Sequence, residues 1–193
     1  INKGNGKVRA LAIPSIKDRI LQRGVMQVIN ETIEYLLEEN SFAYRKGYSR
    51  IGAARAINKY YNAGYKYILE SDIESFFDDV DWEILEKKLR IIFKDDLLVD
   101  LIMQWVKCDV NYKGKVIKRV KGIPQGAAIS PLLANLYLDE FDEALNDNFK
   151  LVRYADDFVI LCKSVEQAES ALNEVKDALS NLKLNVKDSK TNI

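Results

Sequence analysis

Apolar side chains recur along this chain with two different periods. Spacings of three and four residues are typical of an amphipathic helix with one buried face. They predict helices over residues 18–39, 50–61, 82–93, 97–107, 131–145 and 165–182. Four of these helices follow a residue that can cap the first turn, namely Ser49, Asp81, Ser130 and Ser164. Helices therefore account for most of the predicted structure.

Shorter apolar stretches rich in β-branched and aromatic residues predict strands. Residues 65–73 form one such stretch, and residues 182–186 form another near the end of the chain. A pair of strands flanks the turn at 154–157, and residues 110–122 predict a separate hairpin that turns at Lys113-Gly114. Residues 7–14 alternate between polar and apolar positions, so they are also expected to be extended.

The order of these elements predicts an α+β fold. From residue 65 onward the order is βαββαβ, when the 110–122 hairpin is set aside and the helices before the strand pair are counted as one crossover. This is the ferredoxin-like arrangement, with its first and third strands paired at the centre. We therefore expect a mostly helical region over residues 1–66 and a sheet-bearing region over 67–193, with insertions near 82–121.

Three aspartates fall at positions that this topology would bring together. Asp72 ends the first strand, and Asp156 and Asp157 occupy the turn between the second and third strands. Adjacent carboxylates repel one another, and burying them is costly unless a cation neutralises them. Carboxylate oxygens suit Mg²⁺, with Mn²⁺ as an alternative ion. Because two such ions about 3.5–4 Å apart promote in-line phosphoryl displacement, the pattern predicts a metal-dependent phosphoryl-transfer site.

The amino-acid composition excludes several other kinds of site. The chain has 193 residues and no histidine, so it can build neither a Ser-His-Asp or Cys-His site nor a His-ligated zinc site. Cys108 and Cys162 give no disulfide framework and no zinc spacing. No apolar stretch approaches the roughly 18 residues of a membrane span, and there is no signal peptide, so we expect a cytoplasmic protein without membrane contact. Because the chain begins with Ile1, we expect it to be part of a longer protein.

Charge is balanced overall but divided unevenly along the chain. The first 66 residues carry 12 Lys and Arg against 5 Asp and Glu, a net charge of +7, and the remaining residues carry a net charge of −7. A basic region beside an acidic one suggests a polyanionic partner that meets a carboxylate site. Within the basic region, Arg45, Lys46 and Arg50 are interleaved with aromatic rings, which suits contacts to a nucleic-acid backbone.

Six blocks of the sequence, in order, resemble those of reverse transcriptases of the bacterial group II intron-like branch. "VRALAIPSIKDRILQRGV" and "FAYRKGYS" resemble the fingers blocks, and "SDIESFFDDVD" resembles the first catalytic motif. "GIPQGAAISPLLANLYLDEFD" resembles the Pro-Gln-Gly loop and its helix, "YADD" the Tyr-x-Asp-Asp box, and "LKLNVKDSKTNI" the last palm motif. "SFAYRKGYS" is also similar to relatives fused to CRISPR adaptation proteins. The resemblance implies fingers over 1–66 and a polymerase palm over 67–193.

The resemblance also implies an activity, RNA-directed DNA synthesis, and a role for particular residues. Asp72, Asp156 and Asp157 would be the catalytic metal ligands, with the Ile73 carbonyl as a further ligand. Phe77 would exclude a ribose 2′-OH and so favour deoxynucleotides. The remaining implied contacts are those of Lys7 and Arg9 with the triphosphate, Gln125 with the incoming nucleotide, Tyr154 with nucleic acid, and Lys190 with the pyrophosphate. Gly122 and Gly126 would allow close approach of backbone to substrate.

The expected partners are an RNA template with a DNA or RNA primer, dNTPs, and further domains of a parent chain. Those domains are a thumb, which we expect to be absent here, and a fused CRISPR adaptation or maturase domain. Two alternatives stay open. A nucleotidyl cyclase-like palm enzyme would share the hairpin acids, although the Pro-Gln-Gly loop argues against it. A catalytically silent RNA-binding palm module would share the shape, although the intact Asp72, Asp156 and Asp157 argue against that.

Overall fold

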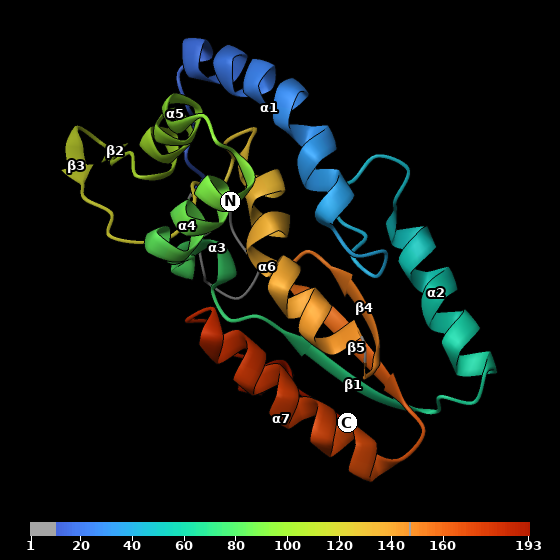
Figure 1. Cartoon of the computed structure of the whole chain (residues 1–193). Helices are drawn as coiled ribbons and strands as arrows, with labels where there is room; N and C mark the ends of the chain where they lie inside the picture. The colour runs from blue at the N-terminus through green and yellow to red at the C-terminus, as the bar shows by residue number, and fades with distance from the viewer. Residues whose placement is uncertain (1–10, 147) are drawn as a thin grey trace.

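The computed structural model describes residues 11–146 and 148–193 of the chain, in the arrangement of Figure 1. The helices α1 (Ile16–Leu36) and α2 (Arg50–Asn62) make up the predicted helical region. Each begins after a serine whose hydroxyl accepts a hydrogen bond from a first-turn N–H, which satisfies one of the unpaired donors of the helix end. The extended stretch expected over 7–14 lies partly outside the described residues, and residues 11–15 have no regular secondary structure.

Three antiparallel strands in the order β1-β5-β4 form the main sheet. β1 (Tyr67–Asp72) pairs with β5 (Asp157–Cys162), and β5 pairs with β4 (Lys150–Tyr154), so the predicted pairing of the first and third strands is confirmed. The strand predicted over 182–186 is wrong. There the chain turns at Lys183, which has a φ of 54°, and its backbone then pairs with the β1 edge only as isolated bridges, of Val186 with Ile73 and of Asn192 with Glu70.

Helices pack on both faces of this sheet (Figure 1). α6 (Ser130–Asn146) and α7 (Val165–Asn181) share a core with Leu151, Phe158 and Ile160, whereas α2 shares a smaller core with Val152 and Leu161. Successive side chains of a strand point to opposite faces, so neighbouring residues enter different cores. The unbroken apolar run of β5 follows from this burial on both sides.

The segment between β1 and α6 carries three helices and a hairpin. α3 (Phe76–Asp79) leads into α4 (Trp82–Ile92) and α5 (Asp96–Val106), and the hairpin of β2 (Val110–Tyr112) and β3 (Lys115–Ile117) follows. The predicted hairpin is therefore confirmed, and its two turn residues both have positive φ. Within residues 11–146 and 148–193, no helix is both long and apolar enough to cross a membrane.

Two glycines of the Pro-Gln-Gly loop lie against the backbone of the protein itself. Gly122 has a φ of +85°, and a Cβ there would lie 2.6 Å from the Asp78 carbonyl oxygen and 2.8 Å from that of Phe77. Gly126 has a φ of +108°, and a Cβ there would lie 2.8 Å from the Ala12 carbonyl oxygen. Both glycines thus approach the chain's own backbone closely, and the approach of Gly122 fixes the loop beside α3.

We expect Gly122→Ala to lower the free energy of unfolding by roughly 2–3 kcal/mol, because it adds an overlap with two carbonyl oxygens to the strain of a positive φ. Gly64→Ala is the matched control, since Gly64 has a φ of +98° but nothing within 4 Å of its added Cβ. The control should lose about 1 kcal/mol from strain alone. Urea unfolding measures both, and equal losses would show that the backbone contact does not select glycine at 122.

Candidate active site

The register of β1 against β5 brings two of the predicted carboxylates together. Asp72 is the direct cross-strand partner of Asp157 at the end of both strands. One residue further on, the Ile73 N–H donates a hydrogen bond of 3.0 Å to the Asp156 carbonyl, which ties the 154–157 turn to the end of β1. Asp72 and Asp157, 85 positions apart in the sequence, therefore share one edge of the sheet.

A lysine neutralises this pair of carboxylates in the structure. Lys190, in the short 3₁₀ helix η1 (Asp188–Lys190), places its Nζ 2.6 Å from Asp72 Oδ2 and 3.5 Å from Asp157 Oδ1. Lys187 Nζ lies 4.0 Å from the other oxygen of Asp72. The Asp72 side chain is 10% exposed and that of Asp157 is 68% exposed, so Asp72 depends more on its lysine partners.

The charges at this edge shift the pKa of two of these groups. Partial burial, followed by the hydrogen bond with Asp72, raises the pKa of the Asp157 carboxyl; the Asp156 and Asp72 charges act in the same direction, and Lys190 opposes them. The hydrogen bond with Asp72 raises the pKa of the Lys190 ammonium, and the neighbouring carboxylate charges add to that shift. Lys190 is therefore held in its charged form, and a more strongly charged cation would compete with it for the same oxygens.

The donor chemistry of this edge fits a hard divalent cation. Asp72 and Asp157 offer carboxylate oxygens to one point, and the backbone of Ile73 and the Asp156 carboxyl lie next to them in the chain. Within the described part of the chain, however, no three acidic or thiol side chains lie together in a metal-binding group. The structure thus brings Asp72 and Asp157 together, and Asp156 does not join them in a preformed three-ligand set.

A cleft of about 910 Å³ opens over these carboxylates. Its lining includes most of the residues expected at the active site: Asp72, Ile73, Phe77, Gln125, Tyr154, Asp156, Asp157 and Lys190. Gln125 Nε2 donates a hydrogen bond of 3.0 Å to Asp78 Oδ1, which holds the Pro-Gln-Gly loop against α3. The half-buried Phe77 ring packs edge-on against Phe76 at 5.3 Å and still reaches the cleft.

The basic residues expected to contact nucleic acid lie outside this cleft lining. Lys46 and Arg50 are exposed. Arg45 is buried, and its guanidinium donates to Glu34 Oε1 at 2.7 Å and to the backbone carbonyls of Leu37, Glu38 and Ser41. Arg45 therefore closes the end of α1 and is not part of the interface proposed below.

Two of the expected triphosphate contacts, Lys7 and Arg9, lie outside the described residues. Sequence reasoning also missed two basic residues close to the site. Lys187 lines the cleft beside Lys190. Arg153 is completely buried next to the 154–157 turn, and a cation that follows the apolar pair Leu151-Val152 inside a strand was the signal that could have marked it.

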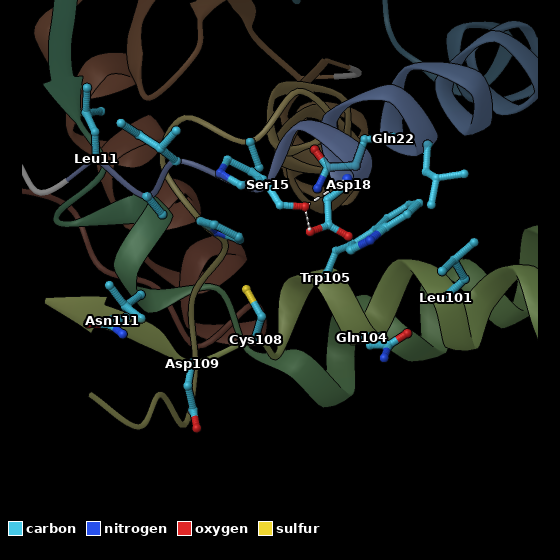
Figure 2. Close-up of a pocket in the computed structure, with 17 residues that line it drawn as sticks. Leu11, Ser15, Asp18, Gln22, Leu101, Gln104, Trp105, Cys108, Asp109 and Asn111 are labelled. Carbon is cyan, nitrogen blue, oxygen red and sulfur yellow. Dashed lines mark hydrogen bonds between the residues drawn. The ribbon is translucent and has the colours of Figure 1, made fainter. Parts of the chain in front are cut away.

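A second cavity, of about 730 Å³, lies between the start of α1 and α5 (Figure 2). Asp18 and Ser15 line it on one side, with the Ser15 hydroxyl 2.6 Å from Asp18 Oδ2, and Trp105 and Cys108 line it on the other. Burial raises the pKa of the Cys108 thiol, which disfavours the nucleophilic thiolate. The lining contains none of the site residues that the sequence predicted, so this cavity is separate from the carboxylate cleft.

Comparisons with known proteins find similarity both in sequence and in fold. Group II intron-encoded protein LtrA from Lactococcus lactis subsp. cremoris is 31% identical over 141 residues, covering 73% of this chain and 23% of LtrA. The solved partial Cas6-RT-Cas1–Cas2 complex is similar over 91% of this chain and 33% of its own, with 38% identity and a TM-score of 0.51. Apo telomerase from Candida tropicalis shares the fold over 88% of this chain and 35% of its own, at 16% identity and a TM-score of 0.68.

The chain spans less than two thirds of the curated relatives it matches, 61% of an Escherichia coli relative and 23% of LtrA. The family model described as "Reverse transcriptase (RNA-dependent DNA polymerase)" matches residues 1–193. With the carboxylates of two paired strands at the floor of a cleft, and with this match over its whole length, the chain belongs to the reverse transcriptase family.

Proposed function

We propose that this chain is the catalytic part of an RNA-directed DNA polymerase that extends a primer by metal-dependent nucleotidyl transfer. The observation that carries the proposal is the convergence of Asp72 and Asp157 at the floor of a cleft that also contains Phe77 and Gln125. Membership of the reverse transcriptase family supports the same reaction. Primer extension on RNA and DNA templates, with Mg²⁺ and then Mn²⁺, tests the activity, the template and the ion.

The palm of this polymerase would be a ferredoxin-like sheet. The order β1-β5-β4, with residues 186–192 bridging to the free edge of β1, supports an edge segment in the place of a fourth strand. On this view residues 67–193 form the palm and residues 1–66 the fingers. α1 of the proposed fingers packs against α6 of the proposed palm, and both helices contribute to one hydrophobic core. The fingers and palm would therefore differ in function without having separate cores.

The carboxylates of Asp72, Asp156 and Asp157 and the carbonyl of Ile73 would hold the divalent ions. When bound, such ions activate the attacking 3′ oxygen and neutralise the leaving pyrophosphate. The β1–β5 ladder fixes the backbone of both Asp72 and Asp157, and the more exposed side chain of Asp157 has more freedom to adjust than that of Asp72. Lys190 must leave Asp72 before it can donate a proton to the pyrophosphate, and its raised pKa keeps that proton available at neutral pH.

Substrate selection would depend on side chains on the α3 side of the cleft. The Phe77 ring would contact the sugar where a 2′-OH would stand, and Gln125 would lie against the incoming nucleotide. Lys46, Arg50 and the exposed ring of Tyr154 would contact the template or primer. Lys7 and Arg9 are proposed for the triphosphate because a cation pairs well with phosphate oxygens.

One observation favours a second candidate, a silent palm that binds RNA without catalysis. Lys190 occupies the space between Asp72 and Asp157, and no three-carboxylate group is preassembled in the described residues. In a silent palm Lys190 would be a permanent partner of these acids, and in a polymerase it would yield to Mg²⁺. The cyclase alternative has no such support, since the whole chain matches the reverse transcriptase family.

We expect Asp156→Asn to abolish nucleotide incorporation while it shifts Tm by no more than about 2 °C, because removing one of several like charges costs the fold little. The matched control is Asp188→Asn, an exposed carboxylate of η1 that lies outside the cleft lining and should keep full activity. Primer extension and thermal unfolding measure the two effects. Activity of Asp156→Asn within tenfold of the parent would rule out its role as a metal ligand.

We expect Phe77→Ala to admit ribonucleotides, because the ring is proposed to exclude the 2′-OH by contact alone. The ratio of kcat/KM for dNTP over rNTP should fall by at least tenfold, about 1.4 kcal/mol of discrimination. Phe77→Tyr keeps the ring and should keep the ratio. An unchanged ratio in folded Phe77→Ala would assign the ring to packing against Phe76.

We expect Lys190→Ala to lower Tm in EDTA and to enlarge the rise in Tm that Mg²⁺ produces, because Asp72 loses its closest cationic partner. Lys183→Ala is the control, since Lys183 forms a 2.7 Å ion pair with Asp81 at similar exposure but away from the cleft lining. Its response to Mg²⁺ should equal that of the parent. An equal response in both variants would mean that Lys190 and Mg²⁺ do not compete, which favours the silent palm.

A further inference from the structure

Arg153 is the residue immediately before the Tyr154-Ala155-Asp156-Asp157 turn, and its side chain is completely buried. Its Nε donates to Asp142 Oδ1 at 2.7 Å, and its Nη2 donates to the other oxygen of Asp142 in a two-point ion pair. Both partners are fully shielded from solvent. This is the planar, bidentate geometry for which arginine is suited and lysine is not.

The remaining guanidinium donors reach two other parts of the chain. Nη1 donates to the Ala155 carbonyl at 2.9 Å, and Nη2 donates to the Ser41 hydroxyl at 2.8 Å. The Arg153 backbone is paired with the same loop, since its N–H donates to Asn40 O at 2.9 Å and its carbonyl accepts from Phe42 N–H at 2.9 Å. One side chain thus joins α6, the loop after α1 and the turn that carries Asp156.

Stability alone does not account for this arrangement. A buried ion pair gains little net stability, because the desolvation of both charges offsets most of their attraction, and an apolar pair of similar volume often folds as well. The contact with Ala155 points to another role. Ala155 has a φ of 61°, a left-handed conformation that costs a non-glycine residue roughly 1–3 kcal/mol unless its surroundings hold it there.

The turn is held from two sides. Arg153 fixes the Ala155 carbonyl from inside the core, and the Ile73 N–H fixes the Asp156 carbonyl from the end of β1. We propose that Arg153 is a positioning residue, which holds the turn so that Asp157 lies beside Asp72 and Asp156 lines the cleft, and which links that geometry to the loop of residues 37–45. The proposal rests on the proposed function for its catalytic readout.

Further hydrogen bonds join the loop of residues 37–45 to the network around Arg153. Asn135 of α6 accepts a hydrogen bond of 3.4 Å from Arg153 Nη1 and donates one of 2.8 Å to the Ala43 carbonyl. The next residue, Tyr44, has a φ of 62° and lines the carboxylate cleft. Hydrogen bonds therefore join the residue before Tyr44 to the network that holds the catalytic turn.

The test compares Arg153→Lys with Arg45→Lys. Both replace a buried arginine that holds the 37–45 loop, but only Arg153 contacts Ala155. A lysine at 153 keeps the charge opposite Asp142 but cannot hold Asp142 and Ala155 together. We expect its kcat to fall at least tenfold while KM for dNTP stays within threefold, and we expect both constants of Arg45→Lys to stay within twofold of the parent.

Asp142→Asn is a second variant, which changes the partner of Arg153 in α6 and leaves Arg153 itself and its contact with Ala155 in place. Its amide keeps one acceptor for Arg153 and loses the other, so kcat should fall by a smaller factor with KM unchanged. Equal kcat for Arg153→Lys, Asp142→Asn and Arg45→Lys would overturn the positioning role. Failure of both Arg153→Lys and Asp142→Asn to fold, when Arg45→Lys folds, would also overturn it and would assign Arg153 to stability.

A readout without catalysis separates this proposal from the proposed function. The rise in Tm produced by Mg²⁺ depends on the placement of the carboxylates, so it should shrink in Arg153→Lys and stay parental in Arg45→Lys. If the parent chain is inactive but the variants show this pattern of Tm, the proposed polymerase activity is wrong and the positioning role of Arg153 stands. If the parent chain is active but Mg²⁺ raises Tm equally in both variants, the polymerase activity stands and the positioning role of Arg153 is wrong.

Discussion

The antiparallel register of β1 against β5 is the constraint on which the rest of the site depends. It pairs Asp72 with Asp157 at one end and Tyr67 with Cys162 at the other. A slip of one residue would turn every side chain of a strand to the opposite face. Phe158 and Ile160 would then leave the core shared with α6 and α7, and Val159 and Leu161 would leave the core beneath α2. The two cores therefore hold the carboxylates in register, although neither carboxylate belongs to a core.

Lysines of the chain itself offset the repulsion between the carboxylates of Asp72 and Asp157. Asp72 is largely buried, and Lys190 and Lys187 approach its two oxygens from a segment whose backbone pairs with this edge through isolated bridges. Those contacts are weaker than a paired strand, since only single residues pair. A site that must accept a divalent cation benefits from lysines carried on such a segment, because they can withdraw without breaking the sheet.

Two buried arginines show how similar residues differ in what they connect. Arg45 donates to the Glu34 side chain of α1 and to the carbonyls of Leu37 and Ser41 after it, so it ties the following loop to that helix. Arg153 donates to a carboxylate, a hydroxyl and the carbonyl of a strained turn, so it connects three segments remote in sequence. In the sequence, Arg45 lies in a basic and aromatic stretch that suggested nucleic-acid binding. Arg153 lies in a predicted strand that carried no such suggestion.

The sequence by itself determined most of the helices and the paired strands, and it predicted residues that line one cleft. Local periodicity and capping residues placed α1, α2, α4, α5 and α7 to within a few residues, because these signals act within one or two turns. The Asp72, Asp156 and Asp157 pattern, with Phe77 and Gln125, pointed to one cleft, since the order of the strands limits which ends can meet.

Tertiary structure decided what depends on distant partners. Residues 182–186 alternate between apolar and polar positions as a strand would, but the chain turns at Lys183, and η1 interrupts its pairing beyond Val186. Gly122 approaches the backbone of α3, which no local pattern specifies. Arg45 turned inward and Lys190 joined Asp72, because the burial of a charge and the choice of its partner are set by atoms brought together only when the chain is folded.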